Sequence, residues 1–453
     1  MKKNFAIYWV ALSVLFAGLV SCSESGYDES VELSPYAMVR SFSLGNIKSA
    51  YPAFTATGED TTVVKTMTME SFAFSIDQQT GKIYNPDSLP FSTNVTKVVT
   101  NLSVEGVPAI YVDSIGDYVS YSTTDSIDFT LPRKLRVYSP NGQNHKDYTI
   151  TVNVHQLNPD KIVWSKYPAI EGVVPGHAVE FNGSMCVFGL KGENSVVAIS
   201  PLDGEPAWAV KDISGISSSS MLSSVKAFNG MLYAIVDGVL YRSDDAVAWT
   251  EVLAGKNLLS IVVSSDAVGE ILVANSSEFM CSYDGVSFET VGLVPSGFPL
   301  YGVSALSYPL SHNKNIIRYI AIGYETSAKD GRARVWSKLS TETAWVDYEN
   351  PGNSFTCPSL NGLSVVRWDN FLYAMGGAGK VAGTEVEAFA SFYISKDNGI
   401  VWKVPSDFYH RIPEELVGDD SLFAVTVDSN NFMWIINADT TWKVIINRLG
   451  FNK

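Results

Sequence analysis

The sequence predicts an all-β protein in which an N-terminal β-sandwich is followed by a six-bladed β-propeller. Helical periodicity is nearly absent, and the chain consists of short runs rich in Val, Ile, Phe, Tyr and Thr that Gly, Asn, Asp and Pro interrupt. Aromatic residues, which favour strands, make up 12% of the 453 residues. Over the last two-thirds of the chain a similar phrase recurs at intervals of roughly 40 residues, the size of a propeller blade.

The start of the chain has the pattern of a bacterial export signal. Two lysines precede an apolar run over residues 5–20, which is too short to span a membrane comfortably. The run ends in LVSC, which resembles the lipobox of bacterial lipoproteins. This resemblance implies that residues 1–21 are a signal peptide and that the thiol of Cys22 is acylated. An ordinary signal peptide that happens to contain a cysteine is the alternative.

Residues 22–34 form the expected tether between this anchor and the first domain. The stretch SESGYDES after Cys22 is similar to the acidic sorting signal of Bacteroidetes-type surface lipoproteins. The resemblance implies a lipid-anchored protein exposed on the outer membrane, with a periplasm-facing position as the alternative. No later segment has an uninterrupted apolar run of membrane length, so the N-terminal lipid is the expected membrane attachment.

Charge and cysteine usage exclude several classes of function. The chain carries a net charge of −15 and has no basic cluster, so we expect no nucleic-acid partner. Beyond Cys22 there are three widely spaced cysteines: Cys186, Cys281 and Cys357. We expect all three to be buried core thiols, with one disulfide between two of them as the alternative. The chain has five histidines: His145, His155, His177, His312 and His410. Their spacing does not match that of metal ligands, so we expect neither a metal nor a cofactor.

The first domain is expected over residues 35–158. Segments such as 72–76 and 148–154 alternate apolar and polar residues, as half-buried strands require, and turn signals separate them. A sandwich of roughly seven strands fits this length. The closing phrase YTITVNVH resembles the immunoglobulin-like modules of Bacteroidetes surface lipoproteins.

The propeller is expected over residues 159–453. Aromatic residues recur at intervals of 41, 39, 57, 57 and 40 residues, at Trp208, Trp249, Phe288, Trp345, Trp402 and Trp442. The two long intervals predict insertions, one of them from Gly376 onward. This spacing predicts six blades, with seven as the alternative. The last phrase, over residues 423–451, supplies only three strands, so we expect the strand at residues 161–166 to close the ring.

The most specific local motif is SKDNGIVW at residues 395–402, which matches the Asp-box pattern Ser-x-Asp-x-Gly-x-x-Trp. Two shortened copies occur earlier in the chain. Such boxes resemble those of sialidases and related glycoside hydrolases with six-bladed propellers, where they are structural and lie away from the catalytic face. The resemblance therefore implies a structural role for three sets of residues: Ser395, Asp397, Gly399 and Trp402; Ser282, Asp284, Gly285 and Phe288; Ser243, Asp245 and Trp249.

No catalytic residue is predicted. A sialidase needs an arginine cluster that begins with an Arg-Ile-Pro phrase early in the propeller, whereas Arg411-Ile412-Pro413 comes far too late. The acidic pairs Glu414-Glu415 and Asp419-Asp420 are typical of a solvated loop. The run at residues 376–379 is expected to be a flexible inter-strand loop, because no helix follows it as a phosphate-binding loop requires.

As a whole, the chain resembles a group of Bacteroidetes lipoproteins that combine a lipobox, a small β domain and a C-terminal propeller. The phrase IYNPDSLP at residues 83–90 looks like a hallmark of this group, which implies no particular activity. Our leading hypothesis is a non-enzymatic surface protein that binds a glycan or another protein at the propeller mouth, with exposed aromatic side chains stacking on sugars. The alternatives are a sialidase-like or other propeller glycoside hydrolase and a scaffold protein with a large apolar patch.

Overall fold

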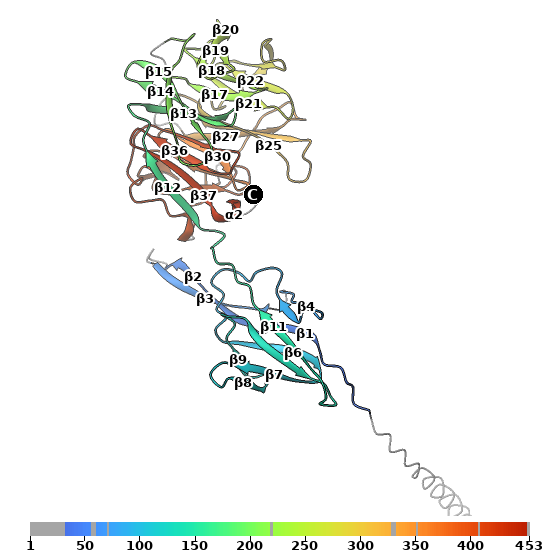
Figure 1. Ribbon diagram of the computed structural model, residues 1–453. Helices are drawn as coiled ribbons and strands as arrows, with labels where there is room; N and C mark the ends of the chain where they lie inside the picture. Colours follow the sequence, from blue (N-terminus) through green and yellow to red (C-terminus); the bar gives the residue numbers. More distant parts are fainter. Residues whose placement is uncertain are drawn as a thin grey trace, which may run out of the picture. The chain divides into compact units, whose positions relative to one another are not determined.

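The computed structural model describes residues 32–55, 60–69, 72–217, 221–327, 332–349, 352–405 and 408–450 (Figure 1). The expected signal peptide, the lipidation site Cys22 and most of the tether lie outside these described residues. The chain divides into two compact units. The first contains the residues up to Tyr51 together with Val64–Gln156, and the second contains Pro52–Val63 together with the residues from Leu157 onward. In the described part of the chain, no helix is long and apolar enough to cross a membrane.

The first unit is a sandwich of two sheets that enclose one apolar core. Buried side chains such as Val39 and Phe42 from one sheet pack with Leu135, Tyr148 and Ile150 from the other. The six-stranded sheet has the order β4 (Ser75–Asp77), β5 (Lys82–Tyr84), β11 (His145–Thr151), β10 (Arg133–Tyr138), β7 (Val107–Val112) and β8 (Asp117–Ser120). The second sheet contains β1 (Met38–Leu44), β6 (Val98–Glu105) and β9 (Ser126–Ile127). A separate hairpin contains β2 (Ile47–Phe54) and β3 (Asp60–Met67), and its segment Pro52–Val63 is grouped with the second unit.

The IYNPDSLP phrase has a structural explanation in this unit. Asn85 is fully buried, and its side-chain amide donates hydrogen bonds to the carbonyl oxygens of Asp87 and Asn153, each at 2.8 Å. The backbone N–H of Asn153 donates in return to Asn85 Oδ1 at 2.7 Å, and Leu89 N donates to Asn153 O at 2.8 Å. Since a buried amide must find partners for all its polar atoms, this phrase fastens the segment after β5 to the segment after β11.

The second unit is a six-bladed propeller, so the predicted fold class is confirmed. Blade 1 contains β13 (Val174–Phe181), β14 (Ser184–Lys191), β15 (Asn194–Pro201) and β16 (Ala209–Asp212). Blade 2 contains β17 (Ser224–Phe228), β18 (Met231–Val236), β19 (Val239–Ser243) and β20 (Thr250–Leu253). Blade 3 contains β21 (Ser260–Ser265), β22 (Glu270–Ala274), β23 (Glu278–Ser282) and β24 (Glu289–Leu293). Blade 4 contains β25 (Tyr301–Pro309), β26 (Ile317–Tyr324), β27 (Ala333–Leu339) and β28 (Val346–Asp347). Blade 5 contains β30 (Ser364–Trp368), β31 (Phe371–Met375) and β34 (Tyr393–Ser395). Blade 6 contains β35 (Phe423–Val427), β36 (Met433–Asn437) and β37 (Thr440–Ile446). The first strands of successive blades are neighbours in a closed ring: β13, β17, β21, β25, β30 and β35.

The ring is closed by a strand from the start of the unit. Strand β12 (Ile162–Pro168) pairs antiparallel with β37 as the fourth strand of blade 6, with Ile162 opposite Ile446. Four of the six recurring aromatic residues come directly before the fourth strand of their blade. Trp402 comes directly before Lys403, which makes an isolated bridge to Ile394 of β34, whereas Trp442 lies on β37, the third strand of blade 6. The aromatic spacing therefore gave the right number of blades while the sixth aromatic occupies a different position within its blade.

Because strands alternate in direction within each blade, the connections fall on two opposite faces of the propeller. We use the name turn face for the side that carries the connections between first and second strands and between third and fourth strands. The first-to-second turns include Asn182-Gly183 and Asn229-Gly230, with φ of 48°, 69°, 50° and 72°, as tight two-residue hairpins require. The opposite side, here the loop face, carries the second-to-third connections and those that lead to the next blade.

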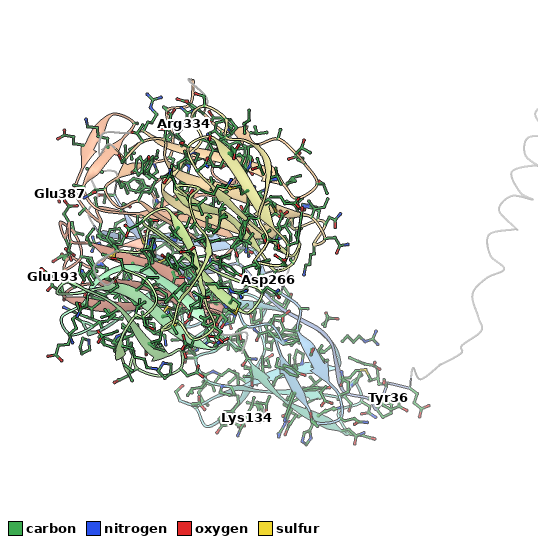
Figure 2. All side chains as sticks on the ribbon, turned by 90° about the horizontal axis from the view of Figure 1, so that it is seen from above. Tyr36, Lys134, Glu193, Asp266, Arg334 and Glu387 are labelled. Carbon is green, nitrogen blue, oxygen red and sulfur yellow. The ribbon has the colours of Figure 1, made fainter. Side chains whose placement is uncertain are left out.

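Long connections gather on the loop face at blades 4 and 5. They include residues 376–392 within blade 5 and residues 408–422 between blades 5 and 6. An additional small sheet forms here from β29 (Ser359–Leu360), β32 (Gly379–Val381) and β33 (Thr384–Val386). Exposed charged side chains such as Glu193 and Glu387 also come from second-to-third connections of the propeller (Figure 2).

Candidate functional site

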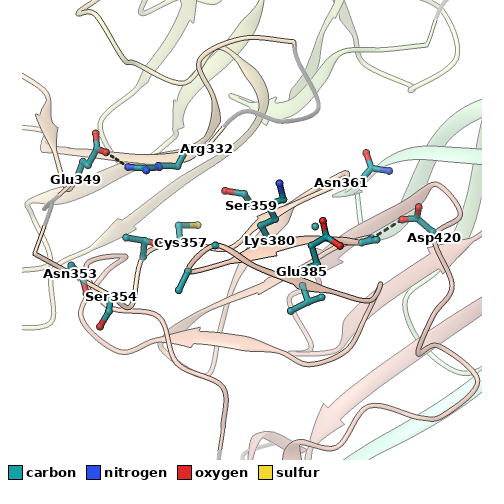
Figure 3. Close-up of a pocket in the computed structure, with 16 residues that line it drawn as sticks. Arg332, Glu349, Asn353, Ser354, Cys357, Ser359, Asn361, Lys380, Glu385 and Asp420 are labelled. Carbon is teal, nitrogen blue, oxygen red and sulfur yellow. Dashed lines mark hydrogen bonds and ion pairs between the residues drawn. The ribbon is translucent and has the colours of Figure 1, made fainter.

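A cleft of about 800 Å³ lies on the loop face beside the small sheet (Figure 3). Arg332 and Glu349 of blade 4 stand at one end, and Asn361 and Asp420 stand at the other. Four residues of the connection between blades 4 and 5 line it as well: Asn353, Ser354, Thr356 and Cys357. The cleft is therefore built from five separate segments of the chain.

The small sheet forms the floor of the cleft and is polar on one face only. Its register places Ser359 opposite Lys380, and Lys380 opposite Glu385, so these three side chains form a cross-strand row that lines the cleft. The alternate residues face the other way, and Leu360 lies in the apolar core with Val381 and Val386 packed against it. Burial of that second face fixes the sheet in place and presents the polar row to the cleft.

The glycine-rich run at residues 376–379 follows β31 and leads into β32, so it connects two strands as expected, and hydrogen bonds link it to Asn361 and Asp420. Gly377 N donates to Asn361 O at 2.8 Å, Asn361 N donates to Ala378 O at 3.0 Å, and Ala378 N donates to Asp420 Oδ1 at 2.9 Å. A Cβ on Gly379 would lie 2.2 Å from Ser359 O, so the strands β29 and β32 approach as closely as they do only because residue 379 is glycine.

The charged side chains of the cleft differ in how far they are already paired. Arg332 and Glu349 form an ion pair at 2.8 Å, and Glu349 also pairs with Arg334. Lys380 and Glu385 are exposed and have no ion-pair or hydrogen-bond partner among the described side chains. The row on the floor therefore offers an uncommitted ammonium group and an uncommitted carboxylate side by side.

Two further features limit the chemistry of the cleft. Cys357 lines it but is buried, and burial raises the pKa of its thiol well above the ordinary value, so the thiol is neutral and a poor nucleophile. None of the described residues that line the cleft is aromatic, so the sugar-stacking platform expected from the sequence is not part of this cleft.

The central channel is crossed by a lysine. Lys226 lies on β17 of blade 2, and its ammonium group donates to the carbonyl oxygen of Ala305 on β25 of blade 4 at 2.9 Å. Burial lowers the pKa of Lys226 to about 8, and burial together with the Lys226 charge lowers the pKa of His177, on β13, to about 4. Because blades 2 and 4 are not neighbours, this hydrogen bond runs across the centre of the ring.

The residues of the best motif match form a turn on the opposite face. Ser395 Oγ donates to Asp397 Oδ1 at 2.7 Å, and the same carboxylate oxygen accepts from Val401 N at 2.9 Å. Gly399 N donates to Ser395 Oγ at 2.8 Å, and Trp402 Nε1 donates to Gly399 O at 2.9 Å. These polar atoms satisfy one another within the third-to-fourth connection of blade 5.

The two shorter copies make similar turns in blades 2 and 3. Asp284 Oδ1 accepts from Ser282 Oγ and from the backbone N–H groups of Val286 and Ser287, which hold its pKa well below the ordinary range. Asp245 does the same with Ser243, Val247 and Ala248, and the backbone N–H groups lower its pKa. Trp249 is buried, Phe288 is half-buried, and Gly285 has a φ of 72°. All three turns are third-to-fourth connections, and the structure does not bring them together. The blade 5 turn touches one residue of the cleft lining, because Asn353 Nδ2 donates to Ile400 O at 2.8 Å.

The other charged candidates are also accounted for individually. Arg411 is exposed on the connection between blades 5 and 6, Glu415 pairs with Lys166, and Asp419 Oδ2 accepts from Asn437 Nδ2 at 2.6 Å. Asp420 is the exception, since the sequence placed it in a solvated loop and the structure places it in the cleft. The remaining described arginines of blades 4 to 6 bind partners within their own surroundings: Arg318 with Ser337 and Tyr348, Arg367 with Asn370, and Arg448 with Asp160 and Asp369.

A general acid would need a carboxyl group whose pKa is raised. Burial raises the pKa of Asp428, but its oxygens accept from Phe432 N and Trp434 Nε1, each at 2.8 Å, in the turn between β35 and β36. This carboxyl group is therefore part of the packing of blade 6. Among the described residues there is no group of three or more His, Cys, Asp or Glu side chains that could hold a metal ion, and the three described cysteines are free and buried.

The sequence did not identify Ser359, Lys380 or Glu385. One signal did point to their region, because the second long interval between aromatic residues predicted an insertion from Gly376 onward. That insertion is the hairpin of β32 and β33. The pairing of β29 with β32, which completes the row, has no signature in strands of two or three residues.

Fold and cleft together define a propeller protein that carries an N-terminal β domain and an open polar cleft on one propeller face. The chain belongs to the DUF6242 family: residues 158–453 match the DUF6242 beta propeller domain, and residues 42–152 match the domain of unknown function (DUF6242) N-terminal domain. Among curated proteins, no match was found.

Several solved structures are similar in fold. YCF48 bound to D1 peptide is 12% identical, covers 64% of this chain and 96% of its own, and gives a TM-score of 0.39. A DUF4623 family protein from Bacteroides eggerthii DSM 20697 is 10% identical, covers 90% of this chain and 98% of its own, and gives a TM-score of 0.35. Streptogramin B lyase is 10% identical, covers 63% of this chain and 98% of its own, and gives a TM-score of 0.39.

Proposed function

We propose that this protein is a non-enzymatic binding protein that holds a saccharide in the loop-face cleft of blades 4 and 5. The observation that carries the proposal is the cross-strand row of Ser359, Lys380 and Glu385 on the floor of an open cleft of about 800 Å³. Ligand sites in proteins are concave and of this general size.

The composition of the row favours a polyhydroxylated ligand. A sugar hydroxyl both donates and accepts hydrogen bonds, and the row provides a donor-only ammonium group, an acceptor-only carboxylate and a hydroxyl. Hydrogen bonds to charged groups are stronger than neutral ones, and Lys380 and Glu385 have no described side-chain partner to compete for them. Neighbouring side chains across such a sheet stand about 5 Å apart, so one ligand can reach all three.

A protein partner is the less favoured ligand for this cleft. Protein interfaces are held mainly by aromatic and arginine anchors at their centre. The described lining of the cleft contains no aromatic side chain, and its arginine, Arg332, is already paired with Glu349. A protein partner at this cleft would therefore lack the usual anchors.

We place this binding activity at the bacterial surface, with the chain anchored in the outer membrane through a lipid on Cys22. The support is the export signal, the lipobox-like LVSC and the acidic stretch that follows. A Cys22→Ala variant is expected to leave the membrane fraction for the soluble fraction of the cell envelope. Continued fractionation with membranes would contradict the lipid anchor without touching the saccharide proposal.

A glycan array followed by calorimetry with the strongest ligand tests the saccharide proposal. Lys380→Ala and Glu385→Ala should each weaken binding by about tenfold, the loss expected for one hydrogen bond to a charged group. Both should leave the free energy of unfolding within about 0.5 kcal/mol, as for other exposed positions. Lys211→Ala and Glu251→Ala, on the exposed outer strands β16 and β20, are the matched controls and should bind normally.

Two outcomes would reject the proposal. One is an array with no glycan above background, and the other is an equal loss of affinity in the control variants. Release of new reducing ends from a bound glycan during prolonged incubation would show that the protein is a glycoside hydrolase and not a binding protein.

A further inference from the structure

A second pocket, of about 520 Å³, lies beside the blade 5 sheet and is lined both by turn residues such as Asp397 and by His410 of the connection to blade 6. One of its walls is a face of the blade 5 sheet. Tyr373 stands opposite Ile394, and Ile394 stands opposite Lys403, which forms one cross-strand row. Phe371 and Lys396 lie two residues further along their strands and therefore on the same face.

The facing side of the pocket is supplied by His410 and by Arg448 of α2 (Asn447–Gly450). The guanidinium group of Arg448 bridges Asp160 and Asp369. The other acidic residue of the lining, Asp397, accepts from Ser395 Oγ and Val401 N. Both carboxylates that line the pocket are thus engaged by protein donors.

The two lysines of the pocket are in a different situation. Lys396 Nζ lies 5.2 Å from the ring centroid of Phe371, and Lys403 Nζ lies 5.0 Å from that of Phe355. Neither has an ion-pair partner among the described residues. A cation–π contact at an exposed site contributes only about 0.5–1 kcal/mol, so these ammonium groups remain free to bind an anion.

The remaining lining is largely apolar. It includes Phe371, Tyr373 and Ile394 on the sheet and Val404 and Pro405 after it. Two uncommitted positive charges beside an apolar wall are unusual in a chain whose net charge is −15. A bound anion would complement these positive charges, and an apolar ring would cover the exposed part of the wall.

We propose that this pocket is a second binding site, which takes a ring compound with an apolar face and a carboxylate or sulfonate group. The ring would lie against Phe371 and Ile394, and the anionic group would accept hydrogen bonds from Lys396 and Lys403. The size of the pocket and its mixture of apolar walls with a few charged groups match small-molecule sites. This site shares no lining residue with the saccharide cleft, so either proposal can fail without the other.

The probe is 8-anilinonaphthalene-1-sulfonate, an aromatic sulfonate whose fluorescence rises in apolar surroundings, and its uncharged counterpart is N-phenyl-1-naphthylamine. With the full chain, the sulfonate should bind about tenfold more tightly than the neutral amine, since it gains a charge-assisted hydrogen bond. Lys396→Gln and Lys403→Gln should each weaken sulfonate binding by about five- to tenfold while changing binding of the neutral amine by less than about twofold.

Exposed lysines elsewhere on the propeller serve as matched controls, so Lys211→Gln and Lys256→Gln should bind both probes like the parent chain. Raising the ionic strength from about 0.01 M to about 1 M shortens the screening length from about 30 Å to about 3 Å and should weaken the sulfonate alone. Equal affinity for the two probes, unchanged sulfonate binding in both pocket variants, or an equal loss in the control variants would each overturn the proposal.

Discussion

The two faces of the propeller differ in what their polar side chains bind. On the turn face, Asp245, Asp284 and Asp397 accept hydrogen bonds from the backbone of their own turns. On the loop face, Lys380 and Glu385 stand in the cleft without a described side-chain partner. A polar side chain that satisfies the backbone stabilises the fold, whereas one that is left unpaired in a concave site is available to a ligand.

The turn face also separates these two roles within a single motif. In each Ser-x-Asp turn the serine and the aspartate point into the turn, and the residue between them does not take part. That residue is Lys396 in blade 5, where it lines the second pocket, and Tyr283 in blade 3, where its side chain is 71% exposed. A repeated structural turn can therefore carry a different functional side chain in each blade at no cost to its hydrogen bonds.

The largest loss of stability is expected from mutating the aromatic residue that packs against a Ser-x-Asp turn. Trp402 is buried and donates through Nε1 to Gly399 O, so Trp402→Ala should lower the free energy of unfolding by about 3–5 kcal/mol. Apart from Trp9, every tryptophan of the chain lies between residues 164 and 442, so tryptophan fluorescence during denaturant unfolding reports on the propeller. Trp402→Phe keeps most of the packing and should lose only about 1 kcal/mol with the Nε1 donor. If the alanine variant lost no more than the phenylalanine variant, the indole would not be holding the turn.

A smaller loss of stability is expected on the loop face, where the strands β29 and β32 of the cleft floor approach each other closely at Gly379. A Cβ on Gly379 would lie 2.2 Å from Ser359 O and 2.7 Å from Leu360 Cα, so Gly379→Ala should separate β29 from β32. Overpacking of this kind costs about 1–3 kcal/mol of unfolding free energy. The same variant should lose saccharide binding, because the cross-strand row is disrupted.

Lys380→Ala, one residue further along β32, is the matched control for that variant. It should lose binding while keeping its stability, so the pair separates the shape of the cleft floor from its chemistry. A Gly379→Ala protein with normal stability and normal affinity would show that β29 is not needed for the cleft.

The sequence predicted those parts of the molecule that depend on local backbone rules. Asn182-Gly183 and Asn229-Gly230 identify two-residue hairpins because both turn positions need a positive φ. The aromatic spacing predicted six blades, but it could not distinguish the third from the fourth strand at Trp442, because the fourth strand of that blade comes from the opposite end of the propeller sequence. A spacing rule records only the order along the chain.

The cleft could not be predicted for a related reason. Ser359, Lys380 and Glu385 meet through the register of three strands, each two or three residues long, and such strands are too short to show periodicity. Asp420 joins them from the connection to blade 6, where it is one of two adjacent acidic residues with the composition of a solvated loop. Only the three-dimensional pairing shows which of these polar residues share a site.

The smallest effect concerns the charge of the turn aspartates. Backbone N–H groups hold the pKa of Asp284 below its ordinary value, so the folded chain binds this proton less tightly than the unfolded chain. Its contribution to stability is therefore complete above about pH 4, the unfolded-state pKa, and is lost as the pH falls below that value toward the folded-state pKa. Asp284→Asn should reduce the steepness with which the unfolding free energy falls between about pH 4 and pH 2, and stability measured against pH by tryptophan fluorescence would show this.

The matched control is Asp212→Asn on β16, an exposed aspartate whose side chain accepts no hydrogen bond in the described structure. This variant removes one surface carboxylate without removing any described hydrogen bond of its side chain, so any change in the acid dependence reports the loss of a surface charge alone. If Asp212→Asn flattened the acid dependence as much as Asp284→Asn, general repulsion in an acidic chain would explain it. The charge of the turn aspartates would then contribute no more to acid stability than the charge of any other surface carboxylate. The difference between the two faces would in that case consist only of the hydrogen-bond geometry of their polar side chains.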